Sequence, residues 1–295
     1  MKAKWNNYLD SLISREKYIK KRYKYPITDI ITDQVLFVQD QKKFNREKSL
    51  ISESINREWQ IAIDFGCGTG ANFNLFNIKK DNDQLLIGIE PDYSRATVAR
   101  KTASKKLKNI NSKIVCGGVE ILENAPKDLS VDLITCVQVL GHVSEKLLDR
   151  IIQGFHKILV NGGKCAIAIP IIGKNFVKNH DASNWSGEDD FTHLVNMNSL
   201  PYKKGYRKQI SFEIFNKIAD HPIAGKLQVR SFLVQDFPDP KTIELPYITE
   251  NIPQSFNRNI EEYFNVEKMI IYSIHRDTKD SNFPVGDAFI FLRKK

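Results

Sequence analysis

The chain has 295 residues, of which 41% are hydrophobic and 27% are charged, and its formal net charge is +9. This composition is typical of a globular protein and excludes a chain that is disordered throughout. The basic excess leaves nucleic acid open as a partner. Lysine, asparagine and isoleucine are abundant along the whole sequence, however, so a general bias in composition also explains the charge without any binding surface.

The N-terminus is polar and no run of about 18 apolar residues occurs, so neither a signal-peptide pattern nor a membrane span is found. The four cysteines, at positions 67, 116, 136 and 165, form no CxxC pair. Their spacing therefore predicts neither a zinc site nor a disulfide framework. We expect a cytoplasmic protein with reduced cysteines, no metal and no membrane partner.

The first predicted element is an amphipathic helix near residues 4–20, where apolar side chains recur at helical spacing. A basic run at residues 20–24 and a short apolar stretch at residues 35–38 follow it, before a polar, helical segment that reaches residue 57. Residues 1–58 are therefore expected to form a helical N-terminal extension or cap.

From Trp59 onward, short apolar runs alternate with helical stretches, which is typical of βαβ units and a parallel sheet. Five strands are expected, near residues 61–64, 85–89, 114–116, 131–136 and 164–169, the last of them stopped by Pro170. Helices are expected at about residues 93–106 and 144–159, and glycines after the second allow it to end. Residues 59–170 are thus predicted to form the core domain.

Residues 171–262 break this alternation with a long irregular stretch, which is typical of a functional insertion or lid. They are expected to contain a helix near residues 211–219 and a strand near residues 227–234. The chain then closes with two apolar runs that predict an antiparallel strand pair completing the core sheet: residues 266–272 and 288–292, within a C-terminal segment of residues 263–295.

A glycine-rich loop follows the first expected strand, in the run Asp64-Phe65-Gly66-Cys67-Gly68-Thr69-Gly70. Its three glycines permit a tight turn in which the backbone approaches a ligand closely, and a helix is expected directly after it. Glu90 ends the second strand, 20 residues after Gly70, where a carboxylate can accept hydrogen bonds from both hydroxyls of a ribose. Together these features predict a site for an adenosine-containing cofactor.

Two classes of cofactor fit this layout. With Ala71, the loop also satisfies the pattern GxGxx[GA] of dinucleotide-binding proteins, which leaves a nucleotide-dependent oxidoreductase open. Asp64 favours the other class, because a carboxylate beside the loop repels a pyrophosphate and attracts a ligand that carries ammonium and sulfonium groups. The terminal strand pair also differs from the second half of a dinucleotide-binding sheet.

The loop, at residues 63–70, resembles motif I of the class I S-adenosylmethionine-dependent methyltransferases. The resemblance continues at residues 90–92 (ribose segment), 116–120 (adenine loop), 131–143 (fourth-strand motif) and 159–164 (turn before strand five). It implies a Rossmann-like α/β fold with a seven-stranded, mostly parallel sheet, a terminal antiparallel pair, helices on both faces, an N-terminal helical extension and an insertion after strand five. It also implies S-adenosylmethionine as cofactor and S-adenosylhomocysteine as product.

The residues assigned to the cofactor lie at the ends of the first four strands. They are Asp64, Phe65, Gly66, Cys67, Gly68, Gly70, Asn72, Glu90, Pro91, Gly118, Val119, Glu120, Gln138 and Val139. One of them departs from the family, since Gly118 stands where an aspartate often receives the adenine amino group. A backbone N–H or carbonyl near Val119 is therefore expected to contact the adenine, with Glu120 as a further contact.

The resemblance implies in-line attack of an acceptor nucleophile on the methyl group, with a general base as an optional addition. For a hydroxyl acceptor that base would be His142, after strand four, or His193, from the insertion, and a packing role is the alternative for both. Aromatic and polar residues of the insertion predict an apolar acceptor pocket with a few polar anchors: Trp185, Phe191, Tyr202, Tyr206 and Arg207.

We therefore expect methyl transfer to a small-molecule acceptor, such as one of a natural-product pathway. Residues 135–139 carry neither the motif of amino-group base methyltransferases nor the Pro-Cys nucleophile of cytosine methyltransferases. Two alternatives remain open. One is an RNA or protein methyltransferase whose basic face joins residues 20–24 to residues 203–208, and the other is a protein that binds the cofactor without turnover. A homodimer is left open as well.

Overall fold

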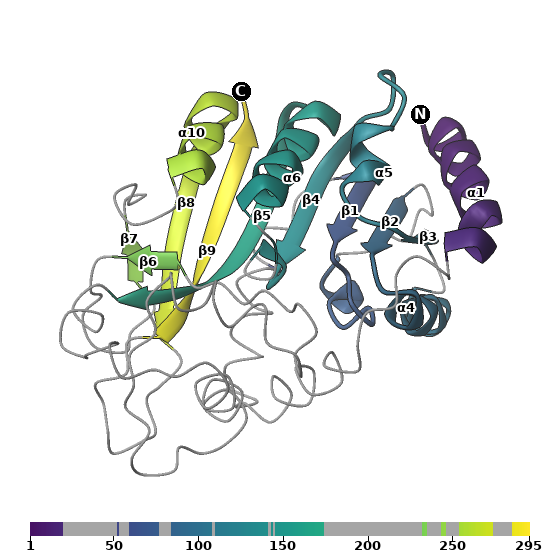
Figure 1. The fold of residues 1–295 in the computed structure, drawn as a ribbon, viewed down its shortest axis with the longest axis horizontal. Coiled ribbons are helices and arrows are strands. Elements are labelled where there is room, and N and C mark those ends of the chain that lie inside the picture. The colour runs from purple at the N-terminus through teal and green to yellow at the C-terminus, as the bar shows by residue number, and fades with distance from the viewer. Residues whose placement is uncertain are drawn as a thin grey trace, which may run out of the picture.

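A computed structural model describes the chain over residues 1–19, 52, 59–76, 84–107, 110–140, 143, 145–173, 232–234, 243–245, 254–273 and 285–295. Its helices are α1 (Lys2–Ile19), η1 (Phe73–Leu75), α4 (Tyr93–Lys106), α5 (Glu120–Glu123), α6 (Glu145–Ile158) and α10 (Gln254–Tyr263). Its strands are β1 (Ile61–Phe65), β2 (Leu85–Glu90), β3 (Asn111–Cys116), β4 (Val131–Val137), β5 (Leu159–Gly173), β6 (Phe232–Val234), β7 (Ile243–Leu245), β8 (Phe264–Ser273) and β9 (Val285–Lys294). Figure 1 shows one twisted sheet, with α1 beside its β3 end and with α6 and α10 as neighbours on one face.

The strands of the described residues form a nine-stranded sheet in the order β3-β2-β1-β4-β5-β9-β8-β7, and β6 pairs with β5 beside this path. The strands β1 to β5 are parallel, whereas β9 is antiparallel to both β5 and β8. For the seven predicted strands this is the order 3-2-1-4-5-7-6. The predicted seven-stranded, mostly parallel sheet with its terminal antiparallel pair is therefore confirmed, and β6 and β7 are short additions to it.

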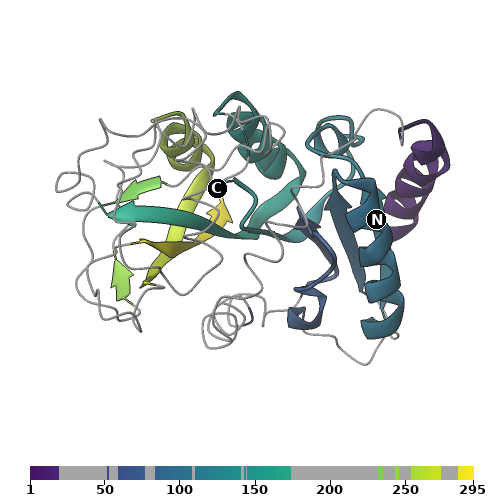
Figure 2. The same ribbon diagram turned by 60° about the horizontal axis from the view of Figure 1, so that its bottom comes forward.

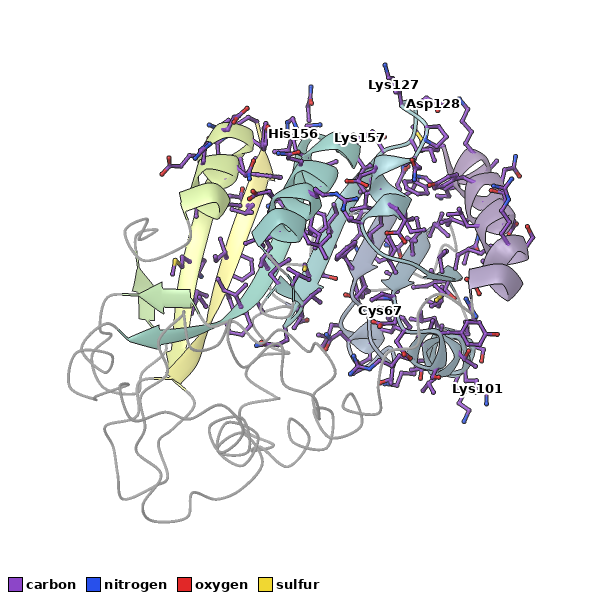
Figure 3. The ribbon with its side chains drawn as sticks, in the orientation of Figure 1. Cys67, Lys101, Lys127, Asp128, His156 and Lys157 are labelled. Carbon is purple, nitrogen blue, oxygen red and sulfur yellow. The ribbon has the colours of Figure 1, made fainter. Side chains whose placement is uncertain are left out.

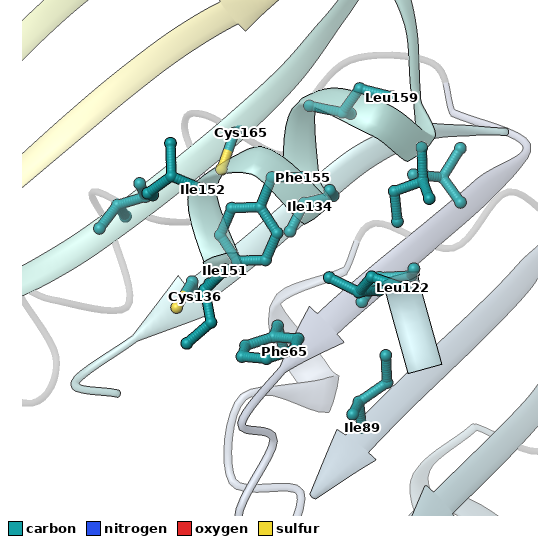
Figure 4. Packing of buried hydrophobic residues seen from close by; sticks show 14 of the residues in the cluster. Phe65, Ile89, Leu122, Ile134, Cys136, Ile151, Ile152, Phe155, Leu159 and Cys165 are labelled. Carbon is teal, nitrogen blue, oxygen red and sulfur yellow. The ribbon is translucent and has the colours of Figure 1, made fainter. Parts of the chain in front are cut away.

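Successive side chains of a strand point to opposite faces of the sheet, and each face carries its own hydrophobic cluster. On β1, Ile63 and Phe65 join the cluster that includes residues of α1, α5, α6 and α10. Ala62 joins the second cluster, with the buried alanines of α4 and Phe73 of η1. Figure 4 shows Phe155 of α6 against Phe65, with ring centroids 5.2 Å apart and an interplanar angle of 79°. Helices thus cover both faces, as expected.

The expected stop of the fifth strand at Pro170 is wrong, because β5 continues through it. The carbonyl of Ala168 accepts the Gln138 N–H at 2.9 Å, so the backbone polar groups of residues 168 and 170 face the β4 side. The register with β4 ends with Val137 opposite Ala168. Pro170 lacks an N–H, but β4 has already ended there, so no hydrogen bond to β4 is lost.

Two helices also differ from expectation. The helix expected directly after the glycine loop is, in the described residues, the short 3-10 turn η1, in which Phe73 packs its ring against the backbone of Gly70. The helix α10 was not expected, although Phe256, Ile260 and Phe264 recur at helical spacing after a proline. Ile260 is fully buried and Asn259 donates to Asp149 of α6 at 3.0 Å, so α10 is fixed to its neighbour.

Some predicted segments fall outside the described residues. They are the basic run 20–24, the apolar stretch 35–38, most of the polar segment up to residue 57, and the helix near residues 211–219. Of the strand expected near residues 227–234, the structure describes β6. In the part of the chain that is described, no helix has the length and apolar character needed to cross a membrane.

The N-terminal helix α1 is held to the β3 edge of the sheet by one buried ion pair. The Glu16 side chain is 6% exposed, and both its oxygens accept hydrogen bonds from Nη2 of Arg100, at 2.6 and 2.7 Å. Glu16 Oε1 also accepts the backbone N–H of Cys116 at 2.8 Å. Arg100 in turn donates to the carbonyl of Ile114. The helix, the edge strand and α4 are thereby joined by one carboxylate.

We predict that Glu16→Ala lowers the free energy of unfolding by about 2 kcal/mol, because it leaves a buried N–H and a half-buried guanidinium without their acceptor. Asp10→Ala is the matched control, since Asp10 pairs with Lys113 from the same helix but its side chain is 57% exposed. That change should shift stability by less than about 0.5 kcal/mol. Urea unfolding followed by circular dichroism measures both, and equal effects would contradict the special role of Glu16.

Candidate cofactor site

The glycine loop leaves β1 at the carboxyl end of the parallel strands and is tied to β2. The backbone N–H groups of Gly66 and Cys67 both donate to the carbonyl of Ile89, at 2.8 and 3.1 Å. Figure 3 shows Cys67 at this end of the sheet, whereas Lys127 and His156 lie at the opposite end. Ligands of open α/β sheets bind outside the carboxyl ends of the strands, so this is the edge at which a site is expected.

Two of the loop glycines meet different surroundings. Gly66 has φ +71°, and a Cβ there would overlap Cγ2 of Val139, so only glycine fits without a shift. Gly68 has φ +56°, but no atom of the described residues lies within 4 Å of its Cβ position. The loop therefore packs tightly against Val139 on one side, while at Gly68 it leaves open space in which a ligand can approach the backbone.

Glu90 lies at the end of β2 and binds the loop itself. Its side chain is 3% exposed, Oε2 accepts the N–H of Gly68 at 2.9 Å, and Oε1 accepts the N–H of Asp92 at 3.0 Å. Burial raises the pKa of Glu90 to about 7, against the lowering effect of these two hydrogen bonds and of Arg95. Each carboxylate oxygen has a second lone pair, so the pair can still accept hydrogen bonds from a ribose.

Asp64 is a buried carboxylate with one unsatisfied oxygen. Its residue is 1% exposed, and Oδ1 accepts the hydroxyl of Thr135, its register partner on β4, at 2.8 Å. Oδ2 is buried and has no hydrogen-bond partner among the described residues. Burial raises the pKa of Asp64 to about 6, and the Thr135 hydrogen bond opposes that shift. An unsatisfied anionic oxygen at this position suits a cationic group such as an ammonium ion.

The turn after β3 lies beside Glu90, because Cys116 is the register partner of Glu90. The N–H of Gly117 donates to the carbonyl of Glu90 at 3.0 Å. The N–H of Gly118 is taken by the Glu120 side chain, with Oε1 at 2.7 Å. The carbonyl of Val119 accepts hydrogen bonds from the first turn of α5. The backbone groups expected to contact an adenine near Val119 are thus partly engaged within the turn.

The end of β4 carries an unusual backbone conformation. Gln138 has φ +58°, the left-handed region that residues other than glycine rarely adopt. Its N–H donates to Ala168, and the next residue, Val139, packs over Gly66. Backbone strain of this kind concentrates at functional sites, and here it turns the chain from β4 across the glycine loop.

The remaining predicted cofactor residues lie at the same edge in different roles. The side chain of Phe65 belongs to the core under α6, so only its backbone faces the loop. Cys67 is buried, its Sγ lies close to Gly88, and burial raises the pKa of its thiol. Asn72 is the N-cap of η1 without a side-chain cap hydrogen bond, and the carbonyl of Pro91 accepts the thiol of Cys116 at 3.5 Å. All four cysteines are free thiols.

The predicted catalytic and acceptor residues lie outside the described residues: His142, His193, Trp185, Phe191, Tyr202, Tyr206 and Arg207. Sequence reasoning missed Thr135, whose hydroxyl fixes Asp64. The signal for it was a polar residue inside the apolar run of β4, at the position that faces β1 in a parallel sheet. Among the described residues, no group of three His, Cys, Asp or Glu side chains is arranged to hold a metal ion.

The strand order is that of the class I fold of S-adenosylmethionine-dependent methyltransferases, and the candidate site lies at the carboxyl edge of that sheet. The family comparison agrees, because residues 62–163 match the family model of a methyltransferase domain. This part of the chain is a methyltransferase domain. No curated protein matches the chain.

Three solved structures illustrate the similarity of fold. The N-methyltransferase NodS from Bradyrhizobium japonicum WM9, in complex with S-adenosylhomocysteine, is 9% identical over 90% of this chain and 97% of that chain, with a TM-score of 0.49. Geranyl diphosphate C-methyltransferase from Streptomyces coelicolor A3(2) is 8% identical over 85% and 79%, with a TM-score of 0.49. The PH0226 protein from Pyrococcus horikoshii OT3 is 12% identical over 88% and 93%, with a TM-score of 0.45.

Proposed function

We propose that this methyltransferase binds S-adenosylmethionine across the carboxyl ends of β3, β2, β1 and β4 and transfers its methyl group to a small molecule. The observation that carries the binding mode is the buried, unsatisfied Oδ2 of Asp64 on one side of the loop, with the Glu90 carboxylate on the other. Asp64 then holds the ammonium group of the methionine moiety, directly or through a water molecule. Glu90 accepts the ribose hydroxyls, and the open backbone at Gly68 faces the ligand between them.

The chemistry requires alignment more than proton transfer, because the sulfonium of the cofactor supplies an activated methyl group when it is bound. Gly66 and Val139 fix the loop by close packing, and the Gly68 N–H fixes the Glu90 carboxylate. These contacts hold the site in one geometry, which favours in-line approach of the acceptor. If the acceptor is a hydroxyl, His142 or His193 is the proposed base. The insertion at residues 171–262 is the proposed acceptor lid, apart from α10, which packs on α6.

A small acceptor is favoured over RNA or protein by two features of the sequence. The end of β4 lacks the base-methyltransferase motifs, and the proposed lid contains the aromatic residues of an apolar pocket. A test is to supply the cofactor with a labelled methyl group to a cell extract and to separate the products by size. Label in the small-molecule fraction supports the proposal, whereas label in RNA or protein, lost steeply at high salt, would support the basic-surface alternative.

We predict that Glu90→Ala weakens binding of S-adenosylhomocysteine by about 1 to 3 kcal/mol, since buried ribose hydroxyls lose a charged acceptor. Isothermal titration calorimetry measures the change. Glu123→Ala is the control, because this carboxylate pairs with the exposed Arg150 at 2.6 Å and is not among the residues assigned to the cofactor. Unchanged affinity in Glu90→Ala would remove Glu90 from the site, and binding of NAD in place of the nucleoside would overturn the cofactor assignment.

A further inference from the structure

The buried carboxylate of Asp64 has one neighbour across the sheet that can donate a hydrogen bond to it. Its register partner on β2 is Gly88, which has no side chain, and its register partner on β4 is Thr135. Thr135 is paired in turn with Ala166 of β5. The row of residues that crosses the sheet from β2 to β5 at Asp64 therefore contains a single side-chain donor, the hydroxyl of Thr135.

Asp64 and Thr135 lie on the side of the sheet that α4 covers. Ala62, two residues before Asp64, belongs to the hydrophobic cluster that includes the buried alanines of α4. Leu133, two residues before Thr135, belongs to the same cluster. Residues two apart on a strand share a face, so both side chains point toward α4 and away from α6 (Figure 2). Each residue is 1% exposed, so their contact is shielded from bulk water.

The geometry of the Thr135 hydroxyl decides where its single proton goes. Its Oγ1 lies 2.8 Å from Oδ1 of Asp64 and 3.5 Å from the carbonyl oxygen of Ile63. A hydrogen bond to a carboxylate is stronger than one to a neutral carbonyl, and it is the shorter of the two here, so the proton is donated to Oδ1. Oδ1 is thereby held toward β4. Oδ2, which has no hydrogen-bond partner among the described residues, is left as the acceptor for a ligand.

The same hydrogen bond favours the ionised form of Asp64. Burial raises the pKa of Asp64 to about 6, and the hydrogen bond from Thr135 opposes this rise. The other titratable groups beside Asp64 in the described part of the chain are the thiols of Cys67 in the loop and Cys136 on β4. Burial raises the pKa of both thiols, so they stay neutral. Thr135 therefore counteracts the loss of charge that burial imposes on Asp64.

We propose that Thr135 is a positioning residue for the cofactor, whose hydroxyl holds Oδ1 of Asp64 and so presents Oδ2 to the ammonium group at the amino-acid end of the ligand. This inference rests on the proposed function, in which Asp64 binds that group. Thr135 itself contacts neither the nucleoside nor the transferred methyl group. It therefore controls the affinity for ligands that carry the ammonium group and leaves the affinity for ligands without it unchanged.

The experiment compares S-adenosylhomocysteine with methylthioadenosine, which has the same nucleoside and sulfur atom but lacks the amino-acid end. Thr135→Val keeps the shape of the side chain and removes the donor. In titration calorimetry at pH 7 it should weaken S-adenosylhomocysteine by at least about 10-fold, as expected for the loss of a hydrogen bond to a buried charge. Methylthioadenosine should bind nearly as before. A general disturbance of the sheet would weaken both ligands alike.

The dependence of affinity on pH gives a second measurement. Without the donor the pKa of Asp64 rises further, so the affinity for S-adenosylhomocysteine should begin to fall at a higher pH in Thr135→Val than in the wild type. Glu90 also titrates at this edge, with its pKa raised to about 7, but it is proposed to bind the ribose of both ligands. The ratio of the two affinities therefore isolates Asp64. In an Asp64→Asn background the valine change should cost much less, because no charge has to be maintained.

Thr135→Ser and Thr135→Ala are a matched pair, because both lose the same methyl group and only serine keeps the hydroxyl. The serine variant should keep the wild-type preference for S-adenosylhomocysteine over methylthioadenosine, and the alanine variant should lose most of it. This pair provides the test if the valine variant does not fold.

The outcomes separate the role of Thr135 from the proposed function. If the wild type does not bind S-adenosylhomocysteine, the proposed function fails and the role of Thr135 fails with it. If the wild type binds it but Thr135→Val weakens both ligands by the same factor at every pH, Thr135 only packs within the sheet. Equal affinities in the serine and alanine variants would lead to the same conclusion. In these two cases the positioning role alone is overturned.

Discussion

Replacing Asp64 by asparagine is expected to weaken binding of S-adenosylhomocysteine by more than about 100-fold, which corresponds to about 3 kcal/mol. The buried oxygen that would face the ammonium group of the ligand loses its charge, while the hydrogen bond from Thr135 can be kept by the amide oxygen. Calorimetry at pH 8 measures the loss. Asp132→Asn is the control, because Asp132 accepts the backbone N–H of Gln60 and Ile61 at the opposite end of the sheet.

The stability of the same variant is expected to depend less on pH than that of the wild type when no ligand is bound. Burial raises the pKa of Asp64 from 3.8 to about 6, so the folded state holds a proton more tightly than the unfolded state does. This group therefore stabilises the fold less as the pH rises from about 4 to about 6, and at pH 7 its ionisation costs about 1 to 3 kcal/mol. Asparagine does not titrate, so the melting temperature of the variant should change less than that of the wild type between pH 4 and pH 7.

The affinity for the ligand should change with pH in the direction opposite to the stability, and should increase as the pH rises. Below about pH 6 Asp64 takes up its proton in the free protein, and the attraction to the ammonium group is lost. Affinity of the wild type should therefore fall between pH 7 and pH 5, and the fall should be shallower in Asp64→Asn. Strong binding by the asparagine variant would place the ammonium group elsewhere.

Gly66→Ala is the change with the second large effect, a loss of about 3 kcal/mol in the free energy of unfolding. Two effects contribute to this loss. The backbone has φ +71°, which is unfavourable for alanine, and the new methyl group overlaps the side chain of Val139. Gly68→Ala is the matched control. Its φ of +56° is unfavourable for alanine as well, but among the described residues no atom lies within 4 Å of the new Cβ. The Gly68→Ala variant should therefore lose only about 1 kcal/mol in the free energy of unfolding.

A double variant isolates the overlap in Gly66→Ala. Adding Val139→Ala removes the atoms that the new methyl group meets, so part of the loss should be recovered relative to the sum of the two single changes. Guanidinium unfolding of the four proteins gives the coupling energy. Strict additivity would show that the close packing of Gly66 on Val139 has no energetic weight.

The central strands β1, β2 and β4 were predictable because almost all of their residues are buried and they read as continuous apolar runs. Pro170 misled the prediction, since whether a strand tolerates proline depends on which neighbour it would have bonded, and this is known only once β4 is seen to end at Val137. The helix α10 could have been predicted from the spacing of Phe256, Ile260 and Phe264, but it follows a long irregular segment and was interpreted as part of it.

The candidate site also contains residues that the sequence predicts and features that it does not. Asp64, the glycines and Glu90 were predictable, because each follows a strand at a spacing that brings it to one edge of a parallel sheet. The fold of Glu120 over Gly118 and the left-handed backbone at Gln138 were not. Both depend on how segments far apart in the sequence pack together. Neither glutamate nor glutamine has a preference for such a conformation that the sequence could reveal.

The contact between Glu16 and the N–H of Cys116 also bears on how the molecule behaves in a concentrated solution. β3 is the last strand at its end of the sheet, and an uncovered edge strand offers unpaired backbone groups to another chain. Near the carboxyl end of that edge, Glu16 takes up one of these donors, and Asp10 binds the Lys113 side chain further along. The N-terminal helix thus covers part of the edge strand and leaves fewer of its backbone groups open to edge-to-edge association.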